Sequence, residues 1–193
     1  TGSSALALAV GDIDGDGKPD LATANYTNPN ISILRNISTG PGNISFAAVY
    51  SFASNRVNSR SIALGDFTGD GKLDIAVDNY GDGGAYVTIV PSTAIPGTIG
   101  SGSFGGSFSL PTAGTNIQAL AIGDTNGDTE VDLVAADYST ATSVLRNTVT
   151  STLTAVFANY ITYIDQASSN GTSTANNVSL VDLNNDGLLD IIR

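Results

Sequence analysis

The stretch GDIDGDGKPD (residues 11–20) places aspartates at positions 12, 14, 16 and 20. Carboxylates this close together repel one another unless a cation lies among them. Oxygen ligands at the first, third, fifth and ninth positions, a glycine at the sixth and a main-chain carbonyl at the seventh match a known calcium-loop spacing. The stretch offers no His or Cys, which zinc or copper would favour. It therefore indicates a site for a hard cation, with Ca²⁺ the best fit.

The same pattern occurs three more times. The first aspartates of the copies, residues 12, 66, 124 and 182, are 54, 58 and 58 residues apart, so the chain is an array of similar units. The further copies are GDFTGDGKLD (65–74), GDTNGDTEVD (123–132) and VDLNNDGLLD (181–190).

Short apolar runs flank every loop, and they are too short for the helices of an EF-hand. Two further runs follow each of the first three pairs, which gives four strands per unit. The runs before the loops cover 5–12, 61–66, 119–124 and 177–182, those after them 20–26, 74–80, 132–138 and 190–193, and the later ones 31–36, 44–52, 86–92, 107–112, 142–147 and 155–163.

Four short strands per repeated unit predict an all-β fold of β-propeller blades, with a calcium loop between the first and second strands of each blade. A strand-based solenoid is the second choice. The whole chain, 1–193, is then one propeller segment, with blades at about 1–56, 57–114 and 115–172 and a half blade at about 173–193. Because propellers close with at least four blades, we expect an incomplete propeller or a fragment.

The charge of the chain is concentrated in the loops. The formal net charge is −11, and fourteen of the eighteen acidic residues lie in the four loops. The seven basic residues are scattered, so the sequence predicts no nucleic-acid partner. No apolar run is long enough to span a bilayer, which predicts no membrane insertion. The chain has no cysteine, so disulfides are excluded.

Each unit resembles the FG-GAP/VCBS repeat. The resemblance lies in the apolar strand, the acidic loop, the LATANY or IAVDNY that follows it and the later ISILRN or TSVLRN. That repeat forms the seven-bladed propeller of integrin α-subunits and occurs in many secreted bacterial proteins and some lectins. The resemblance covers essentially the whole chain. It implies Ca²⁺ in up to four loops, with side-chain ligands at the first, third, fifth and ninth positions and a backbone carbonyl at the seventh.

The resemblance implies five ligating residues in each loop. They are Asp12, Asp14, Asp16, Lys18 and Asp20; Asp66, Thr68, Asp70, Lys72 and Asp74; Asp124, Asn126, Asp128, Glu130 and Asp132; and Asp182, Asn184, Asp186, Leu188 and Asp190.

The four copies differ in charge. Thr68, Asn126 and Asn184 replace the third-position aspartate, so the first loop is expected to bind Ca²⁺ most tightly. Thr129 replaces the turn glycine of the third loop, where a β-branched residue is unfavourable if φ is positive. The third site is therefore expected to be the weakest or to have altered geometry. Arg35 and Arg146 occupy equivalent positions in two units. Both are interpreted as solvated charges at the end of a strand.

Catalysis is not expected. The chain has no His or Cys to act as a general base or nucleophile. The acidic residues outside the loops, which a glycosidase would need, are only Asp78, Asp82, Asp137 and Asp165. We expect Ca²⁺ to be mainly structural, in a module for extracellular recognition or adhesion with a glycan or protein ligand. The ligand would bind the connectors opposite the calcium loops, including 26–30 and 53–60. The alternative is the propeller domain of a secreted carbohydrate-active enzyme, such as a calcium-dependent polysaccharide lyase or hydrolase.

Calcium abundance predicts a secreted, cell-surface or periplasmic location, because free Ca²⁺ is scarce inside cells. The chain has neither an initiator Met nor a signal peptide and is expected to be processed or excised. A longer chain is expected to supply the remaining blades. A second copy of this chain is the alternative source.

Overall fold

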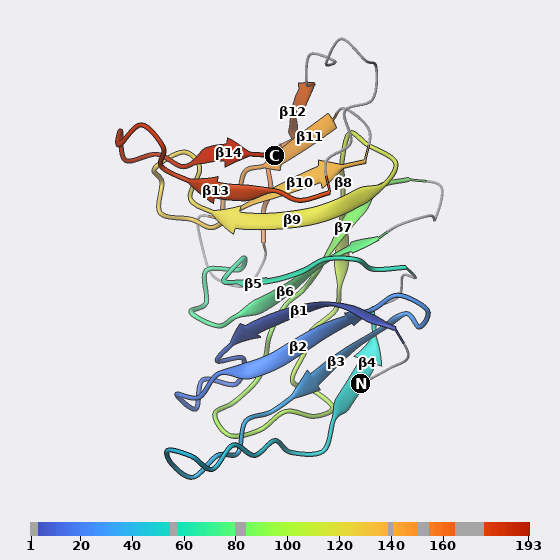
Figure 1. Cartoon of the computed structure of the whole chain (residues 1–193), viewed down its shortest axis with the longest axis vertical. Coiled ribbons are helices and arrows are strands. Elements are labelled where there is room, and N and C mark those ends of the chain that lie inside the picture. Colours follow the sequence, from blue (N-terminus) through green and yellow to red (C-terminus); the bar gives the residue numbers. More distant parts are fainter. Residues whose placement is uncertain (1–3, 55–57, 80–83, 139–140, 150–154, 165–175) are drawn as a thin grey trace.

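The computed structural model describes residues 4–54, 58–79, 84–138, 141–149, 155–164 and 176–193. Within these ranges the regular structure is entirely β, as predicted, and no helix long and apolar enough to cross a membrane is present. The strands form three four-stranded antiparallel sheets and one two-stranded sheet (Figure 1).

Each four-stranded sheet is a meander in which sequential strands pair. The first sheet contains β1 (Ala5–Gly11), β2 (Asp20–Asn25), β3 (Asn30–Leu34) and β4 (Tyr50–Ala53). The second contains β5 (Ile62–Gly65), β6 (Asp74–Asn79), β7 (Tyr86–Val90) and β8 (Phe108–Pro111), and the third β9 (Ile117–Gly123), β10 (Asp132–Asp137), β11 (Ala141–Leu145) and β12 (Ile161–Ile164). The two-stranded sheet pairs β13 (Ser179–Val181) with β14 (Asp190–Ile192).

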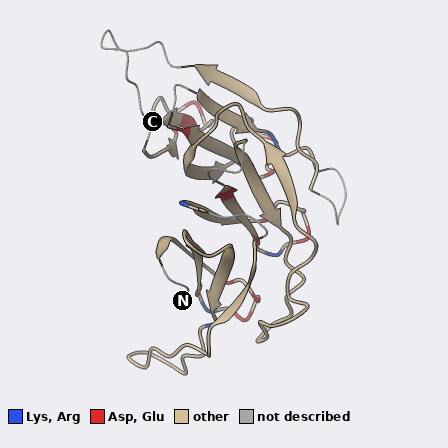
Figure 2. Cartoon of the chain, turned by 90° about the vertical axis from the view of Figure 1, so that its right-hand side faces the viewer, with Lys and Arg blue, Asp and Glu red and all other residues tan. Residues whose placement is uncertain are grey.

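The sheets stack face to face along the chain, which confirms the predicted arrangement of successive blades. The first strand of each sheet contacts the first strand of the next. Figure 2 shows the stack as an open crescent. From here the sheets are called blades 1 to 3 and half-blade 4.

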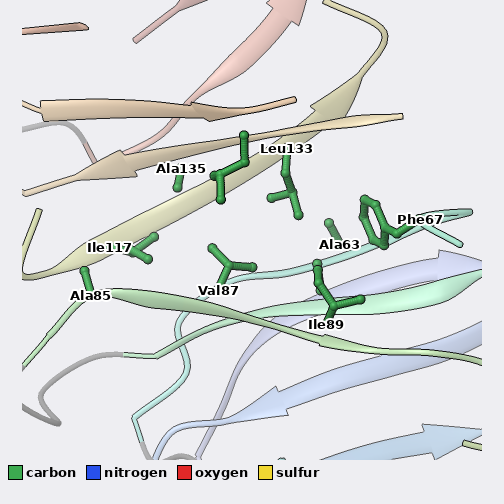
Figure 3. Packing of buried hydrophobic residues seen from close by; sticks show 10 residues of the cluster. Ala63, Phe67, Ala85, Val87, Ile89, Ile117, Leu133 and Ala135 are labelled. Atoms are coloured by element: carbon green, nitrogen blue, oxygen red, sulfur yellow. The ribbon is translucent and has the colours of Figure 1, made fainter. Parts of the chain in front are cut away.

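The central strands of blades 2 and 3 are buried on both faces because each of these two blades lies between two neighbours. Every residue of β6 and of β10 is buried. Alternate side chains point to opposite neighbours, so Ile75 and Val77 pack toward blade 1 while Ala76 packs toward blade 3. The layer between blades 2 and 3 contains Val87, Ile89, Ile117, Leu133 and Ala135 (Figure 3).

Glycines at the ends of the first strands allow close approach between blades. A Cβ on Gly11 would lie 2.7 Å from Leu73 Cδ1, and one on Gly123 would lie 2.5 Å from Leu189 Cδ1. Gly65 faces Val131 in the same way, at 3.2 Å. The corresponding residue of half-blade 4 is Val181, which is 40% exposed. The eighth loop residue of each following blade thus packs onto the blade before it.

Candidate metal centres

All four acidic loops connect the first and second strands of a blade and lie at the same edge of the array (Figure 1). Strand pairing fixes both ends of every loop. Gly11 pairs with Asp20, and Gly65 pairs with Asp74. The corresponding pairs in the last two loops are Gly123 with Asp132 and Val181 with Asp190.

The first aspartate organises the turn of each loop. Asp12 Oδ1 accepts a hydrogen bond from the backbone nitrogen of Asp16 at 3.0 Å, and Oδ2 accepts one from Gly17 at 2.8 Å. The other loops repeat both contacts. Asp66 accepts from Asp70 and Gly71, Asp124 from Asp128 and Thr129, and Asp182 from Asp186 and Gly187.

The fifth-position aspartate accepts a hydrogen bond from the backbone of the seventh loop residue. Lys18 donates its backbone N–H to Asp16 Oδ1 at 3.0 Å, and Lys72 donates to Asp70 at 3.0 Å. Glu130 and Leu188 donate to Asp128 and Asp186 in the same manner. These hydrogen bonds hold the fifth and seventh positions of each loop together.

The ninth-position aspartate has a role that sequence reasoning missed. Asp20 Oδ2 accepts from Ile13 N at 3.1 Å, while Oδ1 accepts from Asn36 N, just beyond β3, at 2.7 Å. Asp74 and Asp132 make equivalent bonds to Ser92 N and Asn147 N, both at the exit of the third strand. This carboxylate therefore joins the loop to a third segment of its blade. The repeated asparagine after ISIL and SVL was the available signal.

The donors of the first loop fit a hard cation. Carboxylate oxygens of Asp12, Asp14 and Asp20 all lie within 4.8 Å of one another. Asp14 Oδ2 is buried and accepts no hydrogen bond from the described residues. Burial raises the pKa values of Asp14 and Asp20. A divalent ion would favour their ionised forms and coordinate the Asp14 oxygen that accepts no hydrogen bond.

The other loops bring fewer carboxylates together because Thr68, Asn126 and Asn184 occupy their third positions. Thr68 Oγ1 is buried in the second loop. Burial likewise raises the pKa of Asp74. In the third loop Thr129 has φ of 73°, a positive value that is unfavourable for a β-branched residue.

A family model describes the chain as an FG-GAP-like repeat over residues 12–77 and 124–192. The chain belongs to the FG-GAP-like repeat family. Each matched region of this FG-GAP chain spans two of the four acidic loops. No curated protein matches the chain significantly. The match identifies the repeat, and the seven-bladed integrin-like propeller stays a prediction.

Two of the four acids outside the FG-GAP loops lie in the described part of the chain, and both are buried. Asp78 Oδ1 accepts backbone hydrogen bonds from Arg60 at 2.7 Å and Ser61 at 2.6 Å. Burial raises the pKa of Asp78 to about 7. Asp137 Oδ2 accepts from Asn116 N at 2.5 Å. Both carboxylates thus fasten the segment that enters a blade; Asp82 and Asp165 lie outside the described residues.

The repeated Asn25 and Asn79 are internal to their blades. Asn25 Nδ2 donates to Ser32 Oγ at 3.1 Å, and Asn79 Nδ2 donates to Thr88 Oγ1 at 2.8 Å. Both asparagines are almost completely buried. They join the second and third strands of their own blades.

Arg35 follows β3 of the FG-GAP chain and reaches into blade 2. Its Nη1 donates a 2.5 Å hydrogen bond to the carbonyl oxygen of Gly97 and lies 3.7 Å from Asp14 Oδ2. Its side chain is 26% exposed, so the expectation of a solvated strand-end charge is wrong for Arg35. Arg146, at the same position of blade 3, is exposed.

A second polar cluster joins three blades at the end opposite the loops. The guanidinium of Arg60 lies 5.4 Å from the ring centroid of Tyr26 in blade 1. Its Nη1 donates to Gln118 Oε1 of blade 3 at 2.8 Å. Three segments far apart in the sequence therefore place a cation, an aromatic ring and an amide together.

Proposed function

We propose that this chain is a non-catalytic, calcium-binding propeller module in which Ca²⁺ mainly stabilises the blades. The observation that carries the proposal is the convergence of Asp12, Asp14 and Asp20 around the buried Oδ2 of Asp14, which accepts no hydrogen bond from the described residues. Aspartates and carbonyls suit a hard cation. A metal that binds the folded state and not the unfolded chain adds directly to stability.

Thermal unfolding, followed by circular dichroism, tests the calcium proposal. The midpoint is measured in millimolar Ca²⁺, in the same concentration of Mg²⁺ and in excess EGTA. Each site adds about 2.7 kcal/mol when Ca²⁺ is a hundredfold above its Kd. We expect a saturable rise of tens of degrees with Ca²⁺ and a much smaller one with Mg²⁺. Equal midpoints in Ca²⁺ and EGTA would refute the proposal.

The buried environments of Asp78 and Asp137 support a non-catalytic role. Each carboxylate accepts hydrogen bonds from backbone nitrogens, and neither is more than 3% exposed. A glycosidase needs two carboxyl groups that both reach the substrate. Buried carboxylates of this kind serve the fold instead.

Recognition of a glycan or an extracellular protein is proposed for the end opposite the loops. Support comes from the cluster of Arg60, Tyr26 and Gln118, since aromatic rings, guanidinium groups and amides are common in binding surfaces. A glycan array probed in Ca²⁺ would separate the two ligand classes. Binding that Arg60→Gln and Tyr26→Ala abolish would support this surface, whereas unchanged binding would exclude it.

The proposed setting is outside the cell or in the periplasm, where Ca²⁺ is abundant.

The outer face of blade 1 exposes Leu6, Leu8 and Val10 by 57–60%. In blade 2 the equivalent face contributes Ile62 and Leu64 to the contact with blade 1. We therefore propose another blade of the same kind as its partner, from a longer chain or a second copy. Light scattering after size exclusion would reveal self-assembly of this chain.

A further inference from the structure

Arg35 lies at the point where the first metal loop meets blade 2. A cavity of about 210 Å³ separates the loops of these two blades there, lined in part by Asp12, Asp14, Lys72 and Pro96. Gly97 follows Pro96 directly, and its carbonyl oxygen accepts the hydrogen bond from Arg35. The guanidinium thus touches the neighbouring blade and the metal loop at once.

Asp14 is the carboxylate nearest to this guanidinium. Its side chain has no exposed surface, and Arg35 Nη1 lies 3.7 Å from Oδ2. Asp14 Oδ1 accepts a hydrogen bond from Asp16 N at 3.1 Å, while Oδ2 accepts none from the described residues. Arg35 therefore provides partial charge compensation for the oxygen that a bound metal would also use.

A comparison of the blades shows that the arginine accompanies the additional carboxylate. In blade 2 the loop has Thr68 in place of Asp14, and Pro91 occupies the position of Arg35. Blade 3 combines Asn126 with Arg146, whose side chain is exposed. In the described residues, the pairing of a third-position carboxylate with a contacting guanidinium occurs in the first loop alone.

We propose that Arg35 is a positioning residue that takes the role of a metal ion in orienting the Asp14 carboxylate. Arg35 thereby lowers the calcium affinity of the first loop. It also couples calcium binding in this loop to the contact with blade 2. This inference rests on the calcium-binding function proposed above. The positive charge of Arg35 opposes the negative charge that Asp14 adds, so the first loop does not gain the full affinity that four aspartates would give.

A calcium titration followed by ¹H–¹⁵N NMR resolves the loops individually. The amides of Gly17 and Gly71 report the first and second loops, because each donates to the first aspartate of its own loop. Arg35→Gln removes the charge and keeps a polar side chain. We expect the first-loop Kd to fall roughly tenfold, the effect of one unit charge near a divalent ion in a water-like dielectric. The second-loop Kd should stay within about twofold.

Two control variants separate charge from structural damage. Arg146→Gln removes the corresponding arginine of blade 3, where no third-position carboxylate is present, and should leave the first-loop Kd unchanged. Arg35→Lys keeps the charge and should stay within about threefold of the wild type. Damage to the loop would weaken binding, so tighter binding distinguishes the proposal. An unchanged or higher Kd in Arg35→Gln would overturn it, as would equal gains in Arg35→Lys and Arg35→Gln.

A double-mutant comparison tests whether Arg35 acts through Asp14. In the Asp14→Asn background, adding Arg35→Gln should change the first-loop Kd by less than about twofold. A persistent tenfold gain would show that Arg35 acts on another group and would overturn the inference. If the wild-type amides do not respond to millimolar Ca²⁺, the proposed function fails and this inference fails with it. A wild-type response without the Arg35 effect refutes the inference alone.

Discussion

The backbone N–H of Ser92 donates a 2.7 Å hydrogen bond to Oδ1 of Asp74, eighteen residues earlier in the chain. The other oxygen of Asp74 accepts from the backbone nitrogens of Phe67 and Thr68. The carboxylate is fully buried. Asp74 therefore stabilises blade 2 without any metal, in addition to the ligand role expected for it.

Asp74→Asn should destabilise the protein even in EGTA. The amide group of Asn would face backbone donors at one of the two oxygen positions, which leaves buried N–H groups unpaired and costs about 3 kcal/mol. Asp70→Asn is the matched control, since Asp70 is half-buried and Asn can still accept from Lys72 N. Urea unfolding in EGTA measures both variants. Equal losses would mean that Asp74 has no special structural role.

Thr129→Gly should stabilise blade 3 and tighten its proposed calcium site. Thr129 has φ of 73°, where a β-branched residue is strained and glycine is not. We expect a gain of about 1 kcal/mol in the free energy of unfolding. The reverse change, Gly71→Thr at φ of 82°, should cause a loss of similar size. A destabilised Thr129→Gly variant would contradict the argument.

Asp78 should make stability depend on pH. Its folded pKa of about 7 lies above the ordinary 3.8, so the native state keeps a proton that the unfolded chain releases. The associated stability is present at low pH and is lost as pH rises from about 4 to 7. Between pH 5 and pH 8, the free energy of unfolding of Asp78→Asn should fall by about 2 kcal/mol less than that of the wild type. Denaturation in saturating Ca²⁺ measures this, and parallel profiles would count against it.

Gly65→Ala should weaken the contact between blades 2 and 3. A Cβ there would lie 3.2 Å from side-chain atoms of Ile122, Phe67 and Val131. Overpacking at such a site costs about 1–2 kcal/mol. Gly106→Ala provides the comparison, because no atom lies within 4 Å of its added Cβ. If both variants unfold at the same urea concentration, the close approach at Gly65 has no energetic importance.

The strands and loops were predictable because their signals are local. Alternating apolar runs and the acidic spacing lie within a few residues of one another, and four copies made the pattern specific. The positive φ at Thr129 followed from the same spacing. The arrangement of strands in successive four-stranded sheets therefore follows from the sequence alone.

The contacts that link blades could not be derived in this way. Arg35 meets Gly97, sixty-two residues away, and Arg60 meets Gln118, fifty-eight residues away. Nothing in the local sequence distinguishes Arg35 from the exposed Arg146, since both follow similar strands. The difference arises from the residues that the next blade places beside them. The burial of Asp78 likewise depends on its position between two packed blades.

The residues that pack onto the first-strand glycines belong to the acidic loops themselves. Leu73 covers Gly11, Val131 covers Gly65 and Leu189 covers Gly123. Opening a loop therefore removes the covering of the preceding blade as well as the loop's own structure. The array behaves as a one-dimensional chain of units coupled to their nearest neighbours. The acidic loops thus set the length over which the molecule unfolds cooperatively.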